Sequence, residues 1–533
     1  MRVAIFQANS LMGDISGNSA RLLTAAQDAT HEGAQLLIAP ELYLLGYPPD
    51  DLVQSPGILT ASHDALNSLA RDLPKEIGVI VGAPIASPQG VLNCAVYIER
   101  GKWHIVSEKM ALPNYNVFDD PRVFAVGRGP GVIQIGDQTI GVMVCEDVWV
   151  DEPIETLLKT TQAPLTMIVS INASPFEHSR LDARYQVVRK TIARTKVPMI
   201  YAAMVGGQDE IVFDGGSFVM DGKGKLLEQF PGFVAGIYYF DFNKKHSAKT
   251  IPSRGKWEEI YQAILLGTRD YVHKNGFTKV CLGLSGGVDS ALVAKIAADA
   301  LGPDNVTAMI MPSAYSGADT MQDARAQAKR LGIHSLEAPI TPTQQALEIT
   351  LQAAFGGELN DIAAQNIQSR LRGLMLMAYS NQSGAMLLTT GNKSELAVGY
   401  ATLYGDMNGG FNPIKDLYKT GVYGLCEWLN THASQPLLPS ILTRAPSAEL
   451  KPGQKDQDTL PPYEILDDVL RALIEGNSDP KLLAKFDPEL VKKIQNWLDK
   501  NEYKRRQSAP GVKVGRKAFG RDRRFPITNK TNF

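Results

Sequence analysis

A glycine-rich turn between an apolar run and an amphipathic helix constrains the fold of this chain more than any other feature. An apolar run ending at Leu282 precedes GLSGGVDS at 283–290, and an amphipathic pattern over 291–301 follows. Gly286 and Gly287 let the backbone turn tightly and approach a ligand, while the first turn of a helix offers free N–H groups to an anion. The sequence therefore predicts an α/β unit in which a strand, a phosphate-binding loop and a helix follow one another.

The type of phosphate loop can be narrowed further. The loop at 283–290 lacks the lysine and the spacing of the GxxxxGK[ST] phosphate loop, which excludes the motor and switch nucleotidases that carry this motif. Ser285, Asp289 and Ser290 surround the glycines, and with them the loop resembles the SGGxDS loop of the ATP pyrophosphatase family. That resemblance implies cleavage of ATP between its α and β phosphates to activate a carboxyl or carbonyl group.

Length and charge limit the remaining possibilities. A chain of 533 residues is too long for one core and should form two or more domains. Its 54 basic and 56 acidic side chains give a net charge of −2, which predicts no general attraction to nucleic acid or to an anionic membrane. Without an apolar run of roughly 18 residues or a signal peptide, we expect a cytoplasmic protein. Four scattered cysteines without a CxxC pair argue against disulfides and zinc.

The first part of the chain alternates short β-branched strands with helices. Strands are predicted near 3–6, 36–39, 79–82, 91–98, 140–145, 166–171 and 198–203. A turn at Asp221-Gly suggests a late hairpin. A charge-rich stretch then interrupts the pattern before a helix begins at Lys256, so we predict a domain over 1–245, a linker over 246–255 and a second domain over 256–533.

The second part shows a βαβ pattern from Val280 to about Leu388, which predicts a parallel sheet with helices on both faces. Residues 444–462 are polar and lack periodicity, which predicts a mobile loop.

Three side chains of the first part could carry out acyl transfer. Cys145 and Glu41 each follow an apolar strand, and Lys109 follows a strand-like segment. A thiol nucleophile, a carboxylate that takes its proton and an ammonium group that stabilises an oxyanion form a complete set for this chemistry. From the strand alone, however, a cysteine such as Cys145 is more often a small core residue.

The sequences around these residues resemble the carbon–nitrogen hydrolase, or nitrilase, family. The shared motifs are PEL at 40–42, KMALPNYNVFD at 109–119 and a strand ending in CED at 145–147. The resemblance implies an αββα sandwich over 1–245, with Cys145 as nucleophile, Glu41 as base and then acid, and Lys109 supporting the tetrahedral intermediate. It also implies that glutamine is held by Tyr115, Glu146, Ser174 and Arg180; a polar cleft lining without specific contacts is the alternative for these four.

An amidase joined to an ATP pyrophosphatase predicts an amidotransferase, in which one half releases ammonia and the other activates its acceptor. Segments at 365–375, 388–400, 402–410, 413–420 and 502–506 resemble NAD synthetases, and the whole chain resembles the glutamine-dependent members. The resemblance implies a doubly wound, Rossmann-like ATP pyrophosphatase domain. It also implies a ligase that adenylates the nicotinate carboxylate of deamido-NAD with ATP, releases pyrophosphate, and then forms NAD⁺ and AMP.

Motif positions within this resemblance imply the binding residues of the second part. The ATP site takes Gly283, Leu284, Ser285, Gly286, Gly287, Val288, Asp289, Ser290, Thr390 and Lys419, with Ser447 as a further candidate from the loop. Mg²⁺ would be held by Asp289 and Glu395, and deamido-NAD by Asn366, Arg370, Glu395 and Lys504. As alternatives, Arg370 and Arg372 could be solvated helix charges, and Glu395 could cap a helix.

Some points depart from this interpretation or compete with it. Tyr503 precedes Lys504 where some ammonia-using relatives have histidine, so the contact made by residue 503 is open. A GMP-synthetase-like enzyme shares the glycine loop but not the contexts of Glu41 and Lys109. A nitrilase with a regulatory ATP-binding module and a catalytically inactive scaffold also compete with the synthetase interpretation. The family resemblance further implies small-molecule substrates and at least a homodimer formed through the synthetase domain.

Overall fold

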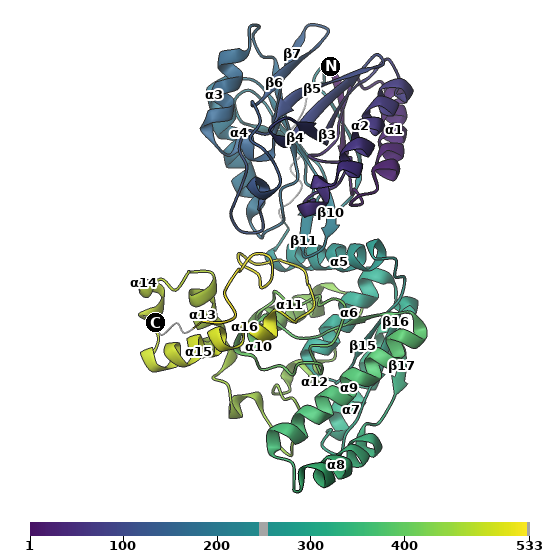
Figure 1. Ribbon diagram of the computed structural model, residues 1–533, viewed down its shortest axis with the longest axis vertical. Helices are drawn as coiled ribbons and strands as arrows, with labels where there is room; N and C mark the ends of the chain where they lie inside the picture. The colour runs from purple at the N-terminus through teal and green to yellow at the C-terminus, as the bar shows by residue number, and fades with distance from the viewer. Residues whose placement is uncertain (245–253, 530–533) are drawn as a thin grey trace. The chain divides into compact units, whose positions relative to one another are not determined.

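The computed structural model describes residues 1–244 and 254–529, which form two compact units, Met1–Arg254 and Gly255–Phe533 (Figure 1). Most of the predicted linker 246–255 lies outside the described residues, so the predicted domain boundaries stay a prediction.

Two six-stranded sheets form the centre of the first unit. The first sheet has the order β14 (Gly236–Asp241), β1 (Arg2–Gln7), β2 (Leu36–Ile38), β3 (Gly78–Ser87), β4 (Gly90–Glu99) and β5 (Lys102–Glu108). The second has the order β13 (Leu226–Gln229), β12 (Phe218–Met220), β9 (Met199–Ala203), β8 (Met167–Asn172), β7 (Gln138–Val144) and β6 (Gly131–Ile135). A separate hairpin pairs β10 (Val205–Gln208) with β11 (Ile211–Asp214).

Strand alternation explains how these sheets are layered. Val3 and Ile5 of β1 join an apolar cluster that also contains Val142 and Ile171 of the second sheet, whereas Ala4 belongs to a cluster on the opposite face. Helices α1 (Ile15–His31) and α2 (Pro56–Asp72) cover the first sheet, and α3 (Asp151–Thr160) and α4 (Arg180–Thr195) cover the second. The predicted αββα sandwich is confirmed. The seven strands predicted from the sequence and the hairpin at Asp221 are also present.

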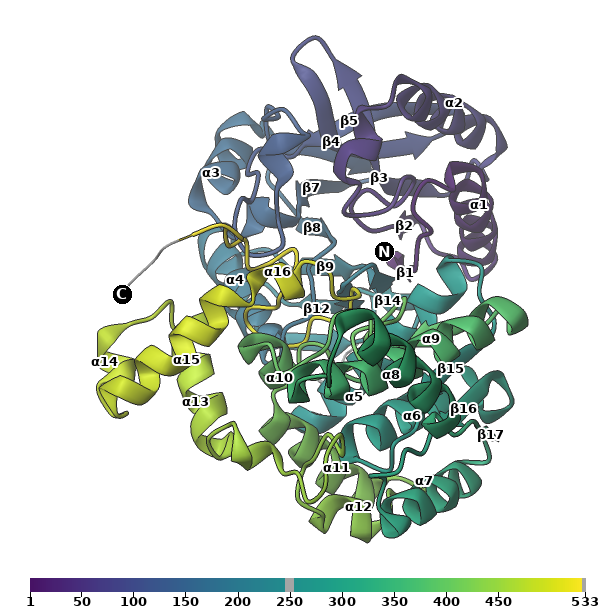
Figure 2. The ribbon, with the colours of Figure 1, turned by 60° about the horizontal axis from the view of Figure 1, so that its bottom comes forward.

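The second unit contains a four-stranded parallel sheet with the order β17 (His334–Glu337), β16 (Val306–Ile310), β15 (Val280–Gly283) and β18 (Met386–Leu388). From β15 the chain runs outward through α6 (Val288–Leu301) and α7 (Ala318–Leu331), and it returns to β18 through α8 (Thr341–Phe355) and α9 (Asp361–Ser383). Because parallel crossovers are right-handed, the two directions place these helix pairs on opposite faces. Figure 2 shows the sheet between them, which confirms the doubly wound prediction.

Further helices surround this sheet. They are α5 (Lys256–Lys274), α10 (Lys393–Val398), α11 (Lys419–His432), α12 (Pro439–Thr443), α13 (Tyr463–Ile474), α14 (Pro480–Leu483), α15 (Pro488–Lys500) and α16 (Glu502–Arg505). Helices α10, α13 and α15 share an apolar cluster that includes Leu396, Leu466 and Ile494. This cluster fixes α10, which carries one of the predicted metal ligands.

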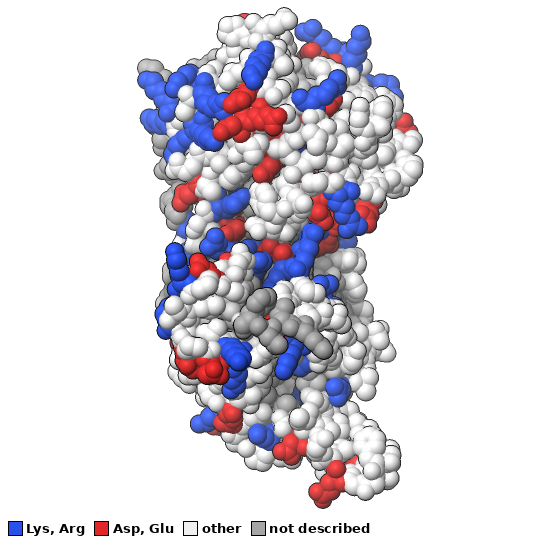
Figure 3. Space-filling view, turned by 60° about the vertical axis from the view of Figure 1, so that its left-hand side comes forward, with Lys and Arg blue, Asp and Glu red and all other residues white. Residues whose placement is uncertain are grey.

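Charged side chains of both signs are interspersed on the face shown in Figure 3, consistent with a net charge of −2. Across the described residues, every helix is too short or too polar to cross a bilayer.

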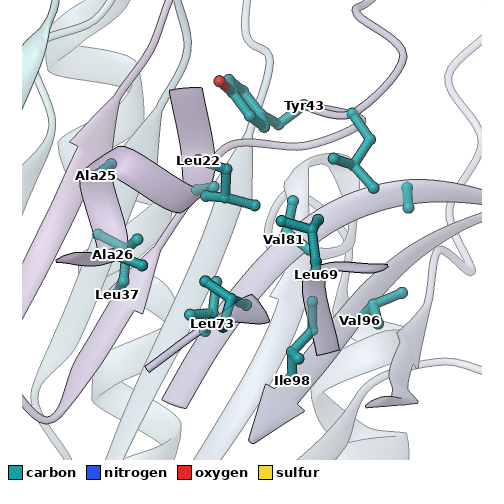
Figure 4. Packing of buried hydrophobic residues seen from close by; sticks show 14 of the residues in the cluster. Leu22, Ala25, Ala26, Leu37, Tyr43, Leu69, Leu73, Val81, Val96 and Ile98 are labelled. Atoms are coloured by element: carbon teal, nitrogen blue, oxygen red, sulfur yellow. The ribbon is translucent and has the colours of Figure 1, made fainter. Parts of the chain in front are cut away.

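The packing of α1 and α2 on the first sheet orients the turn that follows β2. Leu22 and Ala26 of α1 and Leu69 of α2 lie against Leu37 and Val81 of the strands (Figure 4). These contacts bury both helices along one side. They hold β2 and β3 side by side just before the chain reaches the turn that carries Glu41.

Candidate active sites

Glu41, Lys109 and Cys145 come together in the first unit, although they follow three different strands. Glu41 follows β2, Lys109 follows β5, and Cys145 follows β7 of the other sheet. The Lys109 ammonium nitrogen lies 2.8 Å from Glu41 Oε1. All three residues are buried, with Cys145 only 3% exposed. The three predicted catalytic side chains therefore share one water-poor site.

Hydrogen bonds fix the Glu41 carboxylate in place. Its Oε1 accepts from Asn93 Nδ2 at 2.9 Å, and its Oε2 accepts from the backbone N–H of Ala173 at 2.9 Å. The turn itself lies against Gly82, where a Cβ atom would be 2.1 Å from the backbone nitrogen of Leu42. Only glycine allows this close approach.

Lys109 has a second carboxylate partner, Asp120, to which no sequence motif pointed. The Lys109 Nζ to Asp120 Oδ2 distance is 2.7 Å, and Tyr47 donates to Asp120 Oδ1 at 2.8 Å. Burial opposes the lysine charge, but Glu41 and Asp120 together raise the pKa of Lys109 well above its usual value. The two carboxylates therefore favour the charged form of Lys109. The only signal for Asp120 in the sequence was its place at the end of the VFDD run.

The backbone at Cys145 is unusual. Its φ is 47°, in the left-handed region, at the start of the short 3₁₀ turn Cys145–Val148. Burial and the nearby, hydrogen-bonded Glu41 raise the pKa of the thiol well above its usual value. The thiol is protonated at rest, so a nucleophilic Cys145 needs a base, and Glu41 is in position to serve.

Asp147 connects the cysteine turn to the lysine segment. Its Oδ1 accepts from the backbone N–H groups of Met110 and Ala111, at 3.0 and 2.8 Å. Burial raises the pKa of Asp147 to about 7.

The residues predicted to hold glutamine surround the same turn. The Tyr115 hydroxyl donates to Glu146 at 3.0 Å, and burial raises the pKa of Glu146 while Tyr115, Lys109 and Arg180 lower it. The Arg180 guanidinium lies over the Trp149 ring, 4.5 Å from its centroid.

Ser174 is fixed by Arg184, a buried residue that no sequence pattern had indicated. Arg184 donates to the Ser174 hydroxyl at 3.3 Å and to its carbonyl at 3.0 Å, and it pairs with Asp214.

A cavity of about 650 Å³ in the second unit contains most of the predicted synthetase residues. Its lining includes the whole loop 283–290 together with Asn366, Thr390, Glu395, Lys419, Ser447 and Lys504.

Arg370 is outside this lining. It is exposed, and its Nε donates to the Leu403 carbonyl at 3.2 Å, whereas Arg372 lines the cavity. Residues two positions apart on a helix face in different directions. Arg370 is therefore exposed to solvent, whereas Arg372 faces the cavity.

The glycine loop turns tightly at the end of β15 and leads directly into a helix. Gly286 has a φ of 85°, and a Cβ atom there would be 2.2 Å from the Thr320 carbonyl oxygen. Helix α6 begins directly afterwards, with Gly287 as its N-cap. The N–H groups of the first turn therefore face the cavity end of the sheet.

A cluster of charges lies beside the loop. The Lys419 ammonium group pairs with Asp289 and lies 3.4 Å from Glu395 Oε1, while Asn392 donates to Asp289 at 3.0 Å. Burial and the nearby Asp289 raise the pKa of Glu395 to about 8, although Lys419 lowers it. Glu395 also caps α10 in a capping box with Asn392. The same side chain therefore both caps a helix and lines the cavity.

Asp467 of α13 anchors the helix starts that carry these charges. Its carboxylate accepts from the Ser394 hydroxyl, and its Oδ2 accepts from the Thr420 N–H and hydroxyl, both at 2.8 Å. Ser394 in turn accepts from the Lys419 N–H at 2.9 Å. A fully buried carboxylate thus positions the neighbours of Glu395 and the backbone of Lys419.

The segment 444–462, predicted to be mobile, forms bonds around the cavity. Arg444 donates to the Gly286 carbonyl at 3.3 Å, and the Thr320 hydroxyl donates to Glu449 at 2.7 Å. Gln368 of α9 donates to the Leu450 carbonyl at 2.9 Å. The mobility of the segment stays a prediction.

Comparisons with known proteins agree with this division. A model of the carbon-nitrogen hydrolase family matches residues 2–250, and a model of the NAD synthase family matches residues 260–508. The glutamine-dependent NAD(+) synthetase of Synechocystis sp. is 42% identical, with 98% of both chains covered, and that of Thermotoga maritima is 40% identical, with 99% of both covered.

A solved structure of the glutamine-dependent NAD⁺ synthetase from Acinetobacter baumannii, in complex with ADP, has a TM-score of 0.79 and 37% identity, and the match covers 99% of this chain and 98% of that one. End-to-end similarity at this level, together with the two sites described above, shows that the chain belongs to the glutamine-dependent NAD(+) synthetase family.

Proposed function

We propose that this enzyme hydrolyses glutamine at Cys145 and uses the ammonia to convert deamido-NAD into NAD⁺ at the cavity of the second unit. The observation that carries the proposal is the presence, on one chain, of a buried Glu41–Lys109–Cys145 cluster and a glycine-loop cavity with Asp289, Glu395 and Lys419.

In the first reaction, Glu41 takes the proton of the Cys145 thiol as its sulfur attacks the amide carbon of glutamine. Lys109 stabilises the oxyanion of the tetrahedral intermediate, since its charge is maintained by two carboxylates. Glu41 returns the proton to the leaving nitrogen. Ammonia then departs, and a thioester between Cys145 and the glutamyl group remains. Water, deprotonated by Glu41, then releases glutamate and restores the thiol.

Charged side chains around the turn at Cys145 complement the two charged groups of glutamine. Glu146, with Tyr115 donating to it, suits the α-ammonium group of glutamine, and Arg180 suits its carboxylate. Ser174, oriented by Arg184, offers a hydroxyl to the same substrate.

In the second reaction, an oxygen of the nicotinate carboxylate attacks the α-phosphorus of ATP, and pyrophosphate leaves. Residues 283–290 hold the phosphates through backbone N–H groups, assisted by Thr390, Ser447 and the Lys419 cation. Ammonia then attacks the carboxyl carbon of the adenylate, and AMP leaves. Asn366, Glu395 and Lys504 line the cavity as contacts for deamido-NAD, and Arg370 is a fourth contact from outside the cavity lining.

Asp289 and Glu395 suit Mg²⁺, because their carboxylates converge on the Lys419 ammonium group. In the described part of the chain no three His, Cys, Asp or Glu side chains form a metal site alone. This agrees with a cation that takes one or two carboxylates and completes its shell with phosphates and water. When bound, Mg²⁺ offsets phosphate charge during the displacement.

The proposed partners are small molecules, in a cytoplasmic homodimer or larger homo-oligomer. Apolar side chains on α8 and α9 support pairing through the second unit, since Ile349, Phe355, Ile362 and Leu374 are all more than half exposed.

Two nitrogen sources test the proposal. NAD⁺, AMP and pyrophosphate would be followed with deamido-NAD, ATP and Mg²⁺, using either glutamine or ammonium chloride. Cys145→Ala should abolish glutamine-driven synthesis and leave ammonia-driven synthesis within about twofold of wild type. Asp289→Ala should remove both. Cys94→Ala, which removes another buried thiol of the same unit, is the control and should change neither.

One AMP per NAD⁺ from both sources would support the two-site reaction. Loss of ammonia-driven synthesis in a folded Cys145→Ala enzyme would contradict the division of labour. Hydrolysis of glutamine without NAD⁺ formation from either source would contradict the synthetase half.

A further inference from the structure

Arg372 is a cation of the synthetase cavity that no part of the reaction above uses. It lies on α9, is partly buried and lines the cavity. Its Nε donates to the Met311 carbonyl at 3.1 Å, just beyond the carboxyl end of β16. Within residues 1–244 and 254–529, no carboxylate lies within ion-pairing distance of its guanidinium, and no acceptor binds its two terminal nitrogens.

The position of α9 brings this guanidinium near the glycine loop. Leu376, one helical turn after Arg372, approaches Gly283 so closely that a Cβ atom there would be 3.3 Å from it. The Met311 side chain would be 3.4 Å from the same point. Residues four apart share a helix face, so Arg372 lies on the face of α9 that meets the start of the loop.

An unpaired cation in this position is costly. Burial lowers the pKa of Arg372, and Glu449, whose charge offsets this effect, already accepts a hydrogen bond from Thr320. A partly buried guanidinium without an anion is energetically unfavourable unless a ligand supplies one. Its planar pair of terminal nitrogens matches two oxygens of a phosphate group.

We propose that Arg372 binds phosphate oxygens of the nucleotide held in the synthetase cavity. The inference rests on the proposed function, in which two phosphorylated ligands enter this cavity. One is ATP and the other is deamido-NAD, whose pyrophosphate offers the same chemistry. The Met311 carbonyl fixes the Nε side of the guanidinium and leaves the opposite edge for the ligand.

Equilibrium binding of three ligands tests the inference: α,β-methylene-ATP, deamido-NAD and adenosine, each with wild type, Arg372→Met, Arg372→Lys and Arg325→Met. Arg325 is an exposed arginine of α7 paired with Glu337, and its variant is the control. Arg372→Met should weaken at least one phosphorylated ligand about 10- to 100-fold and leave adenosine unchanged. Arg372→Lys should not restore wild-type affinity, because lysine lacks the paired nitrogens.

Comparing the ATP analogue with deamido-NAD shows which ligand's phosphate Arg372 binds. Weaker binding of the ATP analogue alone assigns Arg372 to ATP, and weaker binding of deamido-NAD alone assigns it to the dinucleotide. Unchanged binding of both, or an equal loss for adenosine, would overturn the inference. A wild-type protein that binds neither phosphorylated ligand would instead overturn the proposed function, which separates the two failures.

Discussion

Replacing Asp467 by asparagine should slow NAD⁺ formation while the chain stays folded. Three hydrogen bonds end on the Asp467 carboxylate, from the Ser394 hydroxyl and from the N–H and hydroxyl of Thr420. Asparagine fills the same volume but carries no charge, so each bond changes from charge-assisted to neutral or is lost. The starts of α10 and α11, with Glu395 and Lys419, would then be held less firmly.

The size of the effect follows from these bonds. A charge-assisted hydrogen bond contributes about 1 kcal/mol more than a neutral one, which gives about 3 kcal/mol for the set. If this loss falls entirely on the alignment of Glu395 and Lys419, the rate should fall about 100-fold, because each 1.36 kcal/mol is a factor of ten. If half of it appears as reduced folding stability, the rate should fall about tenfold.

The assay is ammonia-driven NAD⁺ formation, with kcat and the KM values for ATP and deamido-NAD measured separately. Glutamine hydrolysis and the melting temperature are followed on the same samples. Asp468→Asn is the matched control, because the neighbouring Asp468 is half exposed and pairs only with Arg471 among the described residues. Ser394→Ala combined with Asp467→Asn should be less damaging than the sum of the two changes, since both remove the same contact.

A wild-type kcat in Asp467→Asn would refute this reasoning. So would an equal loss in Asp468→Asn, which would point to a general effect of charge on α13. A strictly additive double variant would show that Asp467 does not act through Ser394.

Two further changes probe the glycine loop and the cysteine turn. Gly286→Ala should weaken ATP binding at least about tenfold, from strain at a φ of 85° and contact with the Thr320 carbonyl, while glutamine hydrolysis persists; unchanged ATP affinity would contradict the geometry. Because burial raises the pKa of Asp147 to about 7, the folded carboxyl holds its proton more tightly than the unfolded one. As the pH rises from about 4 to about 7, the stability of the wild type should therefore fall relative to that of Asp147→Asn. Above about pH 7 the difference should stay constant. Parallel melting temperatures of the two proteins over this range would exclude that role.

Short-range sequence signals located the strands and the residues that follow them. Glu41, Cys145 and the loop 283–290 each follow an apolar run that forms a strand. In α/β sheets, ligands bind beyond the carboxyl ends of the strands, so such positions are good candidates for a site. Asp120 was missed because its partner Lys109 is brought to it by a loop without periodicity. Neither propensity nor spacing predicts such a contact.

Helix faces were harder to predict than strand ends. In α9, Ile362 and Leu374 are exposed while Ile367 and Leu376 are buried. Apolar residues therefore occur on more than one side, and the pattern does not say whether Arg370 or Arg372 points inward. Likewise, only the packing of α13 determines that Asp467 is buried and its neighbour is not.

The proposed catalytic side chains of the first unit come from both sheets of the sandwich. Glu41 and Lys109 follow strands of one sheet and Cys145 follows a strand of the other, with Ile38 and Val144 in the apolar layer between them. The spacing between base and nucleophile therefore depends on the thickness of that layer. Reacting groups must come within about 3–3.5 Å, so a missing methyl group in the core can change the rate even when the loss of stability is tolerated. Residues that never touch glutamine thus help to set the speed of its hydrolysis.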